Sequence, residues 1–204
     1  MSTLIGLTGQ SGAGKTIICQ HLIEAGFGVI NCDEIARSCT IDGSECNKEL
    51  AKVFPACFDK KLSLDRMAIS KMIFSDKQML KRFDDIIYPY INRLIDKRIS
   101  ELSRMHDFIV LDAPTLFEAG ADKKCDIIIG VIADKTIRLK RIVKRDGISE
   151  ELALKRFSSQ HTTRFYKNRC DFIIENNASL SEVKSKSQEI ITIIKERING
   201  SSKK

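Results

Sequence analysis

The sequence lacks an apolar run long enough to cross a bilayer. Its longest apolar stretches are Phe108 to Leu111 and Ile127 to Ala133, whereas a membrane-spanning helix needs roughly 20 apolar residues. The chain also has no internal repeat, no low-complexity segment and no basic segment followed by an apolar signal region at its start. We therefore expect a globular protein of the cytoplasm without a membrane partner.

The seven cysteines lack the spacing of a metal site or a disulfide framework. Their number is odd, no two of them form a Cys-x-x-Cys pair, and no histidine lies nearby at zinc-ligand spacing. We favour reduced, structural thiols over metal-binding or disulfide-bonded cysteines.

The net charge of +7 suggests nucleic acid as one possible partner. A protein that holds a nucleotide and an anionic substrate also needs positive charge, and here much of it is concentrated between Arg138 and Arg169. We favour the second interpretation and expect no nucleic-acid partner.

The sequence does contain a glycine-rich phosphate-binding motif, Gly9-Gln10-Ser11-Gly12-Ala13-Gly14-Lys15-Thr16. It follows the strand-like run 4–8 and precedes the helix-like segment 17–25. Glycines let backbone N–H groups turn around an anion, the lysine supplies a charge for the outer phosphates, and the Thr16 hydroxyl can hold Mg²⁺. We therefore prefer a nucleoside-triphosphate site to a structural turn, with nucleotide-binding residues Gly12, Ala13, Gly14, Lys15, Thr16 and Ile17.

Alternating strand-like and helix-like segments predict a single α/β domain over residues 1–204. We expect a five-stranded parallel sheet of the P-loop NTPase type with helices on both faces. The predicted strands are 4–8, 27–30, 108–112, 126–132 and 171–174. The core would comprise residues 1–41, 106–134 and 170–204.

A long helical crossover, residues 42–105, should form a substrate-binding part. Its predicted helices are 45–53, 65–74, 76–87 and 89–105, with Pro89 starting the last one because proline is favoured in a first helical turn. Tyr88, just before it, could line a substrate cleft or lie in a core.

Two carboxylates follow predicted strands, where open α/β sheets bind ligands. Asp33 could accept a proton from a substrate hydroxyl or orient Mg²⁺, or it could only cap a short helix over residues 34–38. Asp112 would hold Mg²⁺ directly or through water.

The basic residues between Arg138 and Arg169 flank a turn at Gly147. Two basic helices joined by this turn, within residues 135–169, resemble a lid over a triphosphate. For any single arginine a solvated helix face is the alternative. Asp134, Ser149 and Ser179 are expected to cap the helices that follow them, Ser179 in a capping box with Glu182.

Together these stretches resemble the dephospho-coenzyme A kinase family. The matching segments are 6–16, 29–37, 112–118, 138–146, Gln160 and 171–177. The phosphate loop is common to many kinases, but its combination with the Asp-x-Pro-x-Leu-Phe-Glu stretch at Asp112 is specific to this family.

The resemblance implies transfer of the γ-phosphoryl group of MgATP to the ribose 3′-hydroxyl of dephospho-CoA, the last step of coenzyme A synthesis. By similarity, Asp33 would be the base, Lys15 and Arg145 would stabilise the phosphoryl charge, and Asn176 would lie near the adenine. The remaining assignments implied are nucleotide binding by Arg141, substrate binding by Asp33, Arg37, Tyr88, Pro89 and Leu116, and Mg²⁺ binding by Thr16 and Asp112. ATP and dephospho-CoA would be the partners of a monomer, with an oligomer left open.

The chain departs from the family pattern at a few positions. Asn31 stands where an Asp is common, Tyr88 replaces a His, and Ala178 replaces a Gly. Another small-molecule or nucleoside monophosphate kinase would use the same loop, carboxylate and lid. A P-loop switch or a nucleic-acid-dependent ATPase is a weaker alternative, since the Asn-Lys-x-Asp guanine motif is missing.

Overall fold

The computed structural model describes residues 2–158 and 160–201. Two compact units divide the chain: Met1–Val29 together with Ser103–Lys204, and Ile30–Leu102. The helical crossover expected at 42–105 thus overlaps the second unit.

A five-stranded parallel sheet in the order β2-β3-β1-β4-β5 confirms the expected fold class. The strands are β1 (Thr3–Gly9), β2 (Gly28–Asn31), β3 (Phe108–Asp112), β4 (Ile127–Ile132) and β5 (Phe172–Glu175). The central β1 lies between β3 and β4, in a register that pairs Leu7 with Asp112 and Gly9 with Val131. The carboxyl ends of these three strands therefore meet at one edge.

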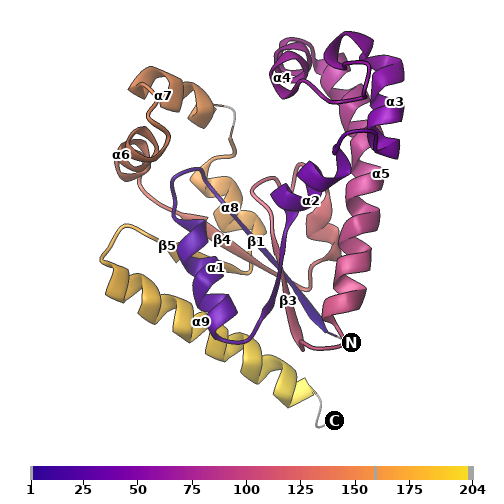
Figure 1. Ribbon diagram of the computed structural model, residues 1–204. Coiled ribbons are helices and arrows are strands. Elements are labelled where there is room, and N and C mark those ends of the chain that lie inside the picture. Colours follow the sequence, from indigo (N-terminus) through magenta and orange to yellow (C-terminus); the bar gives the residue numbers. More distant parts are fainter. Residues whose placement is uncertain (1, 159, 202–204) are drawn as a thin grey trace. The chain divides into compact units, whose positions relative to one another are not determined.

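Helices of the first unit cover both faces of the sheet. On one face, α1 (Lys15–Glu24) and α9 (Leu180–Ser201) lie side by side (Figure 1). Ile5 and Leu7 point into this layer. Between them, Gly6 faces the opposite side, where a Cβ atom would lie 2.6 Å from Leu116. Helix α8 (Thr163–Arg169) packs on β4 on that side.

The basic region of the first unit forms α6 (Lys135–Asp146) and α7 (Glu150–Ser158). Gly147 ends α6 in the left-handed conformation with φ 65°, which confirms the predicted turn, and Ser149 caps α7 through the Leu152 N–H. Asp134 occupies the N-cap position of α6, but its carboxylate accepts from Asn177 instead of the helix. Ser179 accepts from the Glu182 N–H as predicted for α9.

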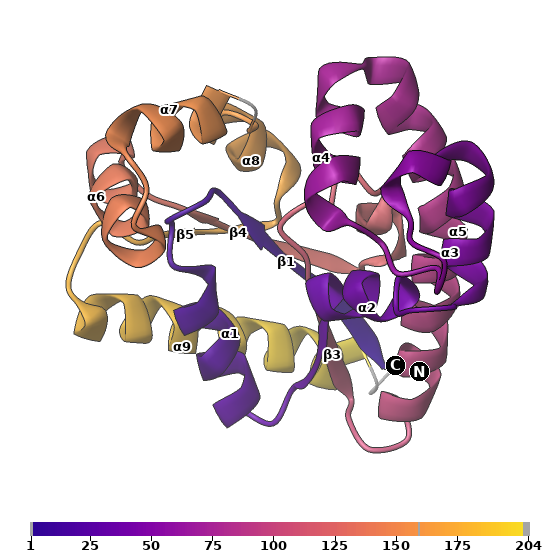
Figure 2. The same ribbon diagram turned by 45° about the horizontal axis from the view of Figure 1, so that its top comes forward.

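The second unit is a helical cluster around its own apolar core (Figure 2). Its elements are α2 (Cys32–Cys39), α3 (Glu45–Val53), the short η1 (Pro55–Cys57), α4 (Arg66–Ser75) and α5 (Lys77–Leu102). Helices α2, α3 and α4 all contact α5, and Leu50, Phe54 and Ile87 are buried between them.

The predicted helix break at Tyr88-Pro89 is wrong, because α5 is one helix of 26 residues that continues through Pro89. A proline inside a helix loses one backbone hydrogen bond and costs about 3 kcal/mol. Burial of Ile87 and Ile95 on either side of it offsets this cost. At the end of the chain, α9 extends to Ser201, and residues 202–204 lie outside the described residues.

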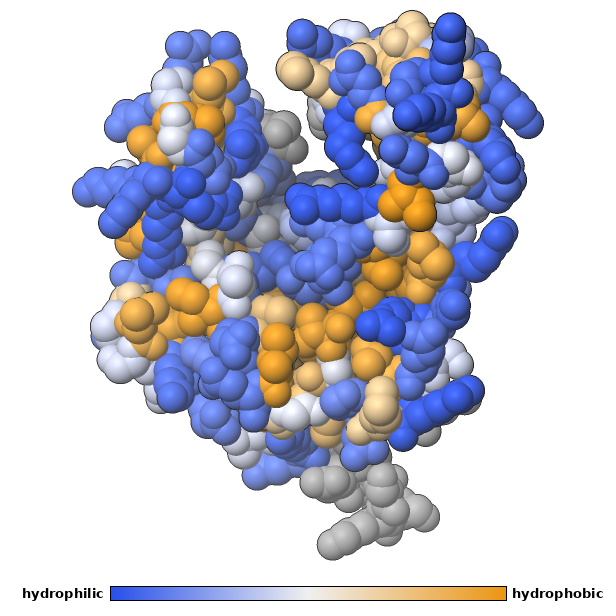
Figure 3. All heavy atoms as spheres, viewed as in Figure 1, coloured by the Kyte–Doolittle hydropathy of each residue, from blue (hydrophilic) through white to orange (hydrophobic). Residues whose placement is uncertain are grey.

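Among the described residues, no helix is both long and apolar enough to span a membrane. All seven cysteines are free thiols. On the face that carries α1 and α9, apolar side chains lie among hydrophilic ones (Figure 3), and Ile23 and Leu180 are among the exposed apolar residues. Exposed apolar atoms are common on folded proteins and mark no site by themselves.

Candidate functional site

The phosphate loop connects β1 to α1 in the first unit. Gly12 and Gly14 have φ values of 78° and 91°, in the left-handed region that favours glycine. A Cβ atom on Gly14 would also lie 2.1 Å from the Asn176 Nδ2 atom. The loop therefore needs glycine for conformation and for space, and it leads directly into the positive end of the α1 dipole.

Lys15 and Asp112 form an ion pair at the carboxyl edge of the sheet. Their side chains are only 16% and 14% exposed. Thr16 follows Lys15 in the first turn of α1. The Thr16 hydroxyl and the Asp112 carboxylate offer oxygen atoms, the donors that Mg²⁺ prefers, so the residues present fit this ion chemically.

Asn176 and Arg141 contact the backbone of the loop. The buried Asn176 donates from Nδ2 to the Ala13 carbonyl at 2.7 Å and accepts from Arg141 Nη2 at 3.3 Å. Arg141 also donates to the Gly12 carbonyl at 3.4 Å. The structure thus brings together Asn176, Arg141 and the loop from three separate stretches of sequence.

Arg145 and Leu116 have other surroundings. The exposed Arg145 donates two hydrogen bonds to Asp146, which also accepts from Arg156. These bonds raise the pKa of Arg145 and lower the pKa of Asp146. Leu116 is fully buried, with its side chain against Gly6. The roles predicted for Arg145 and Leu116 stay predictions.

The other predicted site residues belong to the second unit. Asp33 is exposed in the first turn of α2, and the helix cap is Asn31, whose side chain accepts from the Asp33 and Glu34 N–H groups at 3.0 and 3.2 Å. A cap by Asp33 for a helix starting at residue 34 is therefore wrong. Asn and Asp cap helices about equally well, so the Asn31 departure from the family pattern preserves this function.

On α2 and α5, the remaining predicted substrate residues differ in exposure. Arg37 and Pro89 are exposed, whereas Tyr88 is partly buried and packs against the core of the second unit. The alternative that Tyr88 is a core aromatic thus has structural support.

Sequence reasoning assigned no role to Arg138 or to Gln160, yet both contact the phosphate loop at Ser11. Gln160 was marked only by the family resemblance, and Arg138 by that resemblance and by its position in the basic region. Neither signal indicates a contact with a loop more than a hundred residues away.

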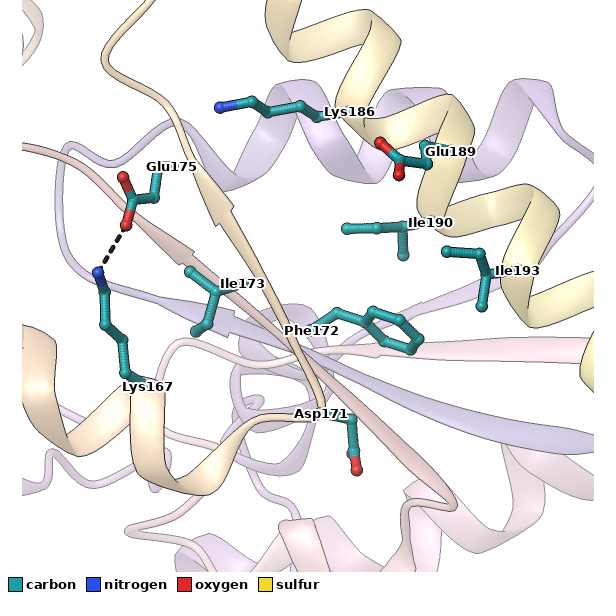
Figure 4. A pocket seen from close by; sticks show the side chains of 9 residues that line it. All are labelled: Lys167, Asp171, Phe172, Ile173, Glu175, Lys186, Glu189, Ile190 and Ile193. Carbon is teal, nitrogen blue, oxygen red and sulfur yellow. Dashed lines mark ion pairs between the residues drawn. The ribbon is translucent and has the colours of Figure 1, made fainter.

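A groove of about 650 Å³ lies elsewhere in the first unit, between β5 and α9 (Figure 4). Its apolar lining includes Phe172, Ile173 and Ile190, and its lining residues Lys167 and Glu175 form an ion pair at 2.7 Å. None of its lining residues belongs to the phosphate loop. We therefore assign the candidate site to the phosphate loop because of the chemistry of its residues, although the groove is a cavity of large volume.

The chain is similar to known proteins over most of its length. The family model described as dephospho-CoA kinase matches residues 3–182. Dephospho-CoA kinases of Fusobacterium nucleatum and Syntrophotalea carbinolica are each 34% identical to the chain, over 88% and 89% of it and over 92% and 87% of their own lengths.

Solved structures show the same relationship. A Thermus thermophilus protein matches with a TM-score of 0.83 and 28% identity over 94% of this chain and 97% of its own. Dephospho-CoA kinase from Campylobacter jejuni matches with a TM-score of 0.70 and 26% identity over 95% of this chain and 98% of its own. The chain, with its glycine-rich loop, the Lys15–Asp112 pair and these full-length matches, belongs to the dephospho-CoA kinase family.

Proposed function

We propose that the protein transfers the γ-phosphoryl group of ATP to the ribose 3′-hydroxyl of dephospho-CoA, giving coenzyme A. The observation that carries this proposal is the phosphate loop, with the Lys15–Asp112 pair beside it, in a chain matched almost throughout by the family model. We expect the reaction to take place in the cytoplasm and the enzyme to act as a monomer.

In the first unit, the loop N–H groups and Lys15 bind the phosphates of ATP, and Arg141 and Asn176 complete the nucleotide site. Thr16 and Asp112 would hold Mg²⁺, which neutralises phosphate charge when bound. Lys15 pairs with Asp112, so its ammonium group would exchange this carboxylate for an outer phosphate when ATP binds. Arg145 would stabilise charge on the transferring group, which requires its release from Asp146.

The second unit supplies the acceptor side of the reaction. Asp33 accepts the proton of the substrate hydroxyl as it attacks, a role that its exposed carboxylate at the start of α2 permits. The further substrate residues of this proposal are Arg37, Tyr88, Pro89 and Leu116.

The test is a coupled assay of ADP release by the purified protein with MgATP. Dephospho-CoA is compared with AMP, CMP and no acceptor. We expect strong stimulation by dephospho-CoA alone, because related kinases share the loop but differ in the acceptor that they hold. If a nucleoside monophosphate stimulates ADP release instead, or if no acceptor stimulates it, the substrate assignment is contradicted.

A further inference from the structure

Three successive carbonyl groups of the phosphate loop accept hydrogen bonds from side chains outside it. The donors are Arg138 Nε to Ser11 at 2.9 Å, Arg141 Nη1 to Gly12 at 3.4 Å, and Asn176 Nδ2 to Ala13 at 2.7 Å. A planar trans peptide points its C=O and its N–H in opposite directions. Holding the Ser11 and Ala13 carbonyls outward therefore aims the N–H groups of Gly12 and Gly14 the other way.

Ser11 is held at three atoms, two of them by one side chain. The Gln160 amide donates from Nε2 to Ser11 Oγ at 2.6 Å, and its Oε1 accepts from the Ser11 N–H at 3.2 Å. The Ser11 carbonyl is bound by Arg138. Because its N–H and its C=O are both bound, the backbone angles φ and ψ of Ser11 are restrained from outside the loop.

Gln160 and Arg138 also hold each other. Arg138 Nη2 donates to Gln160 Oε1 at 3.2 Å, so this oxygen bridges the guanidinium and the Ser11 N–H. Because Gln160 follows α7 and Arg138 lies on α6, the basic helical segment is joined to the loop at this point.

The Arg138 side chain is unusually buried for a charged residue, since the residue is only 5% exposed. Its described partners are the Ser11 carbonyl, the Gln160 amide and the ring of Phe157, 4.1 Å from the guanidinium carbon. Burial lowers its pKa. A buried cation is costly without such partners, and one that keeps its positive charge beside an anion-binding loop strengthens that loop electrostatically.

We propose that Gln160 and Arg138 are positioning residues for the nucleotide: they hold Ser11 so that the loop is already shaped for phosphate before ATP arrives. This inference rests on the proposed function of the same loop. It predicts that ATP affinity depends on Gln160, which acts through Ser11, whereas affinity for the acceptor does not.

The decisive variant is Gln160→Met, which keeps side-chain length but removes both amide functions. Gln160→Glu keeps the oxygen that accepts from Ser11 and Arg138, and Gln188→Met makes the same change on the exposed side of α9 as a control. MgADP binding is measured by calorimetry, the KM values for ATP and dephospho-CoA by the coupled assay, and folding by thermal melting.

We expect Gln160→Met to weaken MgADP binding about tenfold and to raise the KM for ATP similarly, the effect of losing one or two hydrogen bonds. The KM for dephospho-CoA should stay near wild type, and the melting temperature should fall only slightly, because the Ser11 carbonyl and the Phe157 ring still hold Arg138. Gln160→Glu should lose less affinity than Gln160→Met, and Gln188→Met none.

Unchanged MgADP binding in Gln160→Met, or a Gln160→Glu variant as weak as Gln160→Met, would overturn the proposal. An equal rise in both KM values would do so as well, because it would indicate a general structural role. If the wild-type protein itself binds no MgADP, the proposed function of the loop fails instead, so the two failures are distinguishable.

Discussion

Asp112 occupies the last position of β3, where its carboxylate meets the Lys15 ammonium group. Both side chains are largely buried, so their charges are screened less than those of a surface pair. One carboxylate can neutralise the lysine and, when a nucleotide is bound, contribute to holding Mg²⁺. Of these two roles, the metal role is the one that the Mg²⁺ requirement of the enzyme tests.

We expect Asp112→Asn to raise the Mg²⁺ concentration needed for half-maximal turnover about tenfold or more, because changes at a metal site commonly cost that much affinity. Activity as a function of free Mg²⁺ measures this. Asp107→Asn, a change just before the opposite end of the same strand, is the matched control. An unchanged Mg²⁺ requirement in Asp112→Asn would exclude Asp112 as a metal ligand.

Asp33 is the residue proposed to take the proton of the acceptor. Asp33→Asn keeps the size of the side chain but removes the base, so turnover should fall about 100-fold or more while MgADP binding is retained. Single-turnover kinetics and calorimetry measure the two quantities. Glu34→Gln, in the same helical turn, should remain near wild type. Near-normal turnover by Asp33→Asn would reject the assigned base.

At the scale of single elements, α2 shows how one side chain sets a helix start. Asn31 accepts from the N–H groups of Asp33 and Glu34, which otherwise have no partner within the helix. Asn31→Ala should lower the free energy of unfolding by about 1 kcal/mol. Asn31→Asp, which keeps an acceptor oxygen, should be nearly neutral. Urea denaturation of both variants provides the check, and equal losses would show that the cap contributes little.

Helix α5, in contrast, contains a residue that destabilises it. Pro89 is exposed in the interior of α5 and has no N–H group to donate. Pro89→Ala should therefore raise the free energy of unfolding by about 1 to 3 kcal/mol. The exposed Lys97→Ala serves as a control for the same helix, with a change near zero. No gain in Pro89→Ala would indicate that the surrounding helix has already adapted to the ring.

For the whole molecule, buried and half-buried thiols make stability depend on alkaline pH. Burial raises the pKa of Cys19 and Cys46 to about 11 and that of Cys170 to about 12, from an ordinary value of 9.0. Above pH 9.0 the unfolded chain loses these protons while the folded chain keeps them. Stability is therefore fully present below pH 9.0 and falls as pH rises through the folded pKa values.

Urea midpoints measured under reducing conditions between about pH 8 and about pH 11 test this dependence. The midpoint should fall progressively across that range. Cys46→Ala, which removes one of the buried thiols, should show a shallower fall than the wild type. A flat profile would mean that the thiols titrate in the folded protein as they do in the unfolded chain.

The local parts of the fold could be predicted from the sequence because their signals are local. Apolar runs predicted the five strands, and helix 45–53 and the strand at 108–112 were predicted with their observed bounds. The phosphate loop was also predicted, because its glycines, Lys15 and Thr16 form one short motif, although the close approach of Asn176 to Gly14 carries no local signal.

Errors arose where tertiary packing outweighs a local preference. Proline favours a first helical turn, but the buried Ile87 and Ile95 keep α5 continuous through Pro89. The cap of α2 was misplaced by two residues because Asn31 and Asp33 are both good caps, and only the backbone conformation distinguishes them.

The sequence by itself determined the parallel sheet, the loop and the reaction class, since these rest on short motifs in order along the chain. Only the tertiary structure decided that Gln160 and Arg138 hold Ser11, and that Asn176 binds Ala13. These bonds join residues more than 120 positions apart. A polar side chain carries no local signal of its distant partner, so such contacts follow only from how the strands and helices pack.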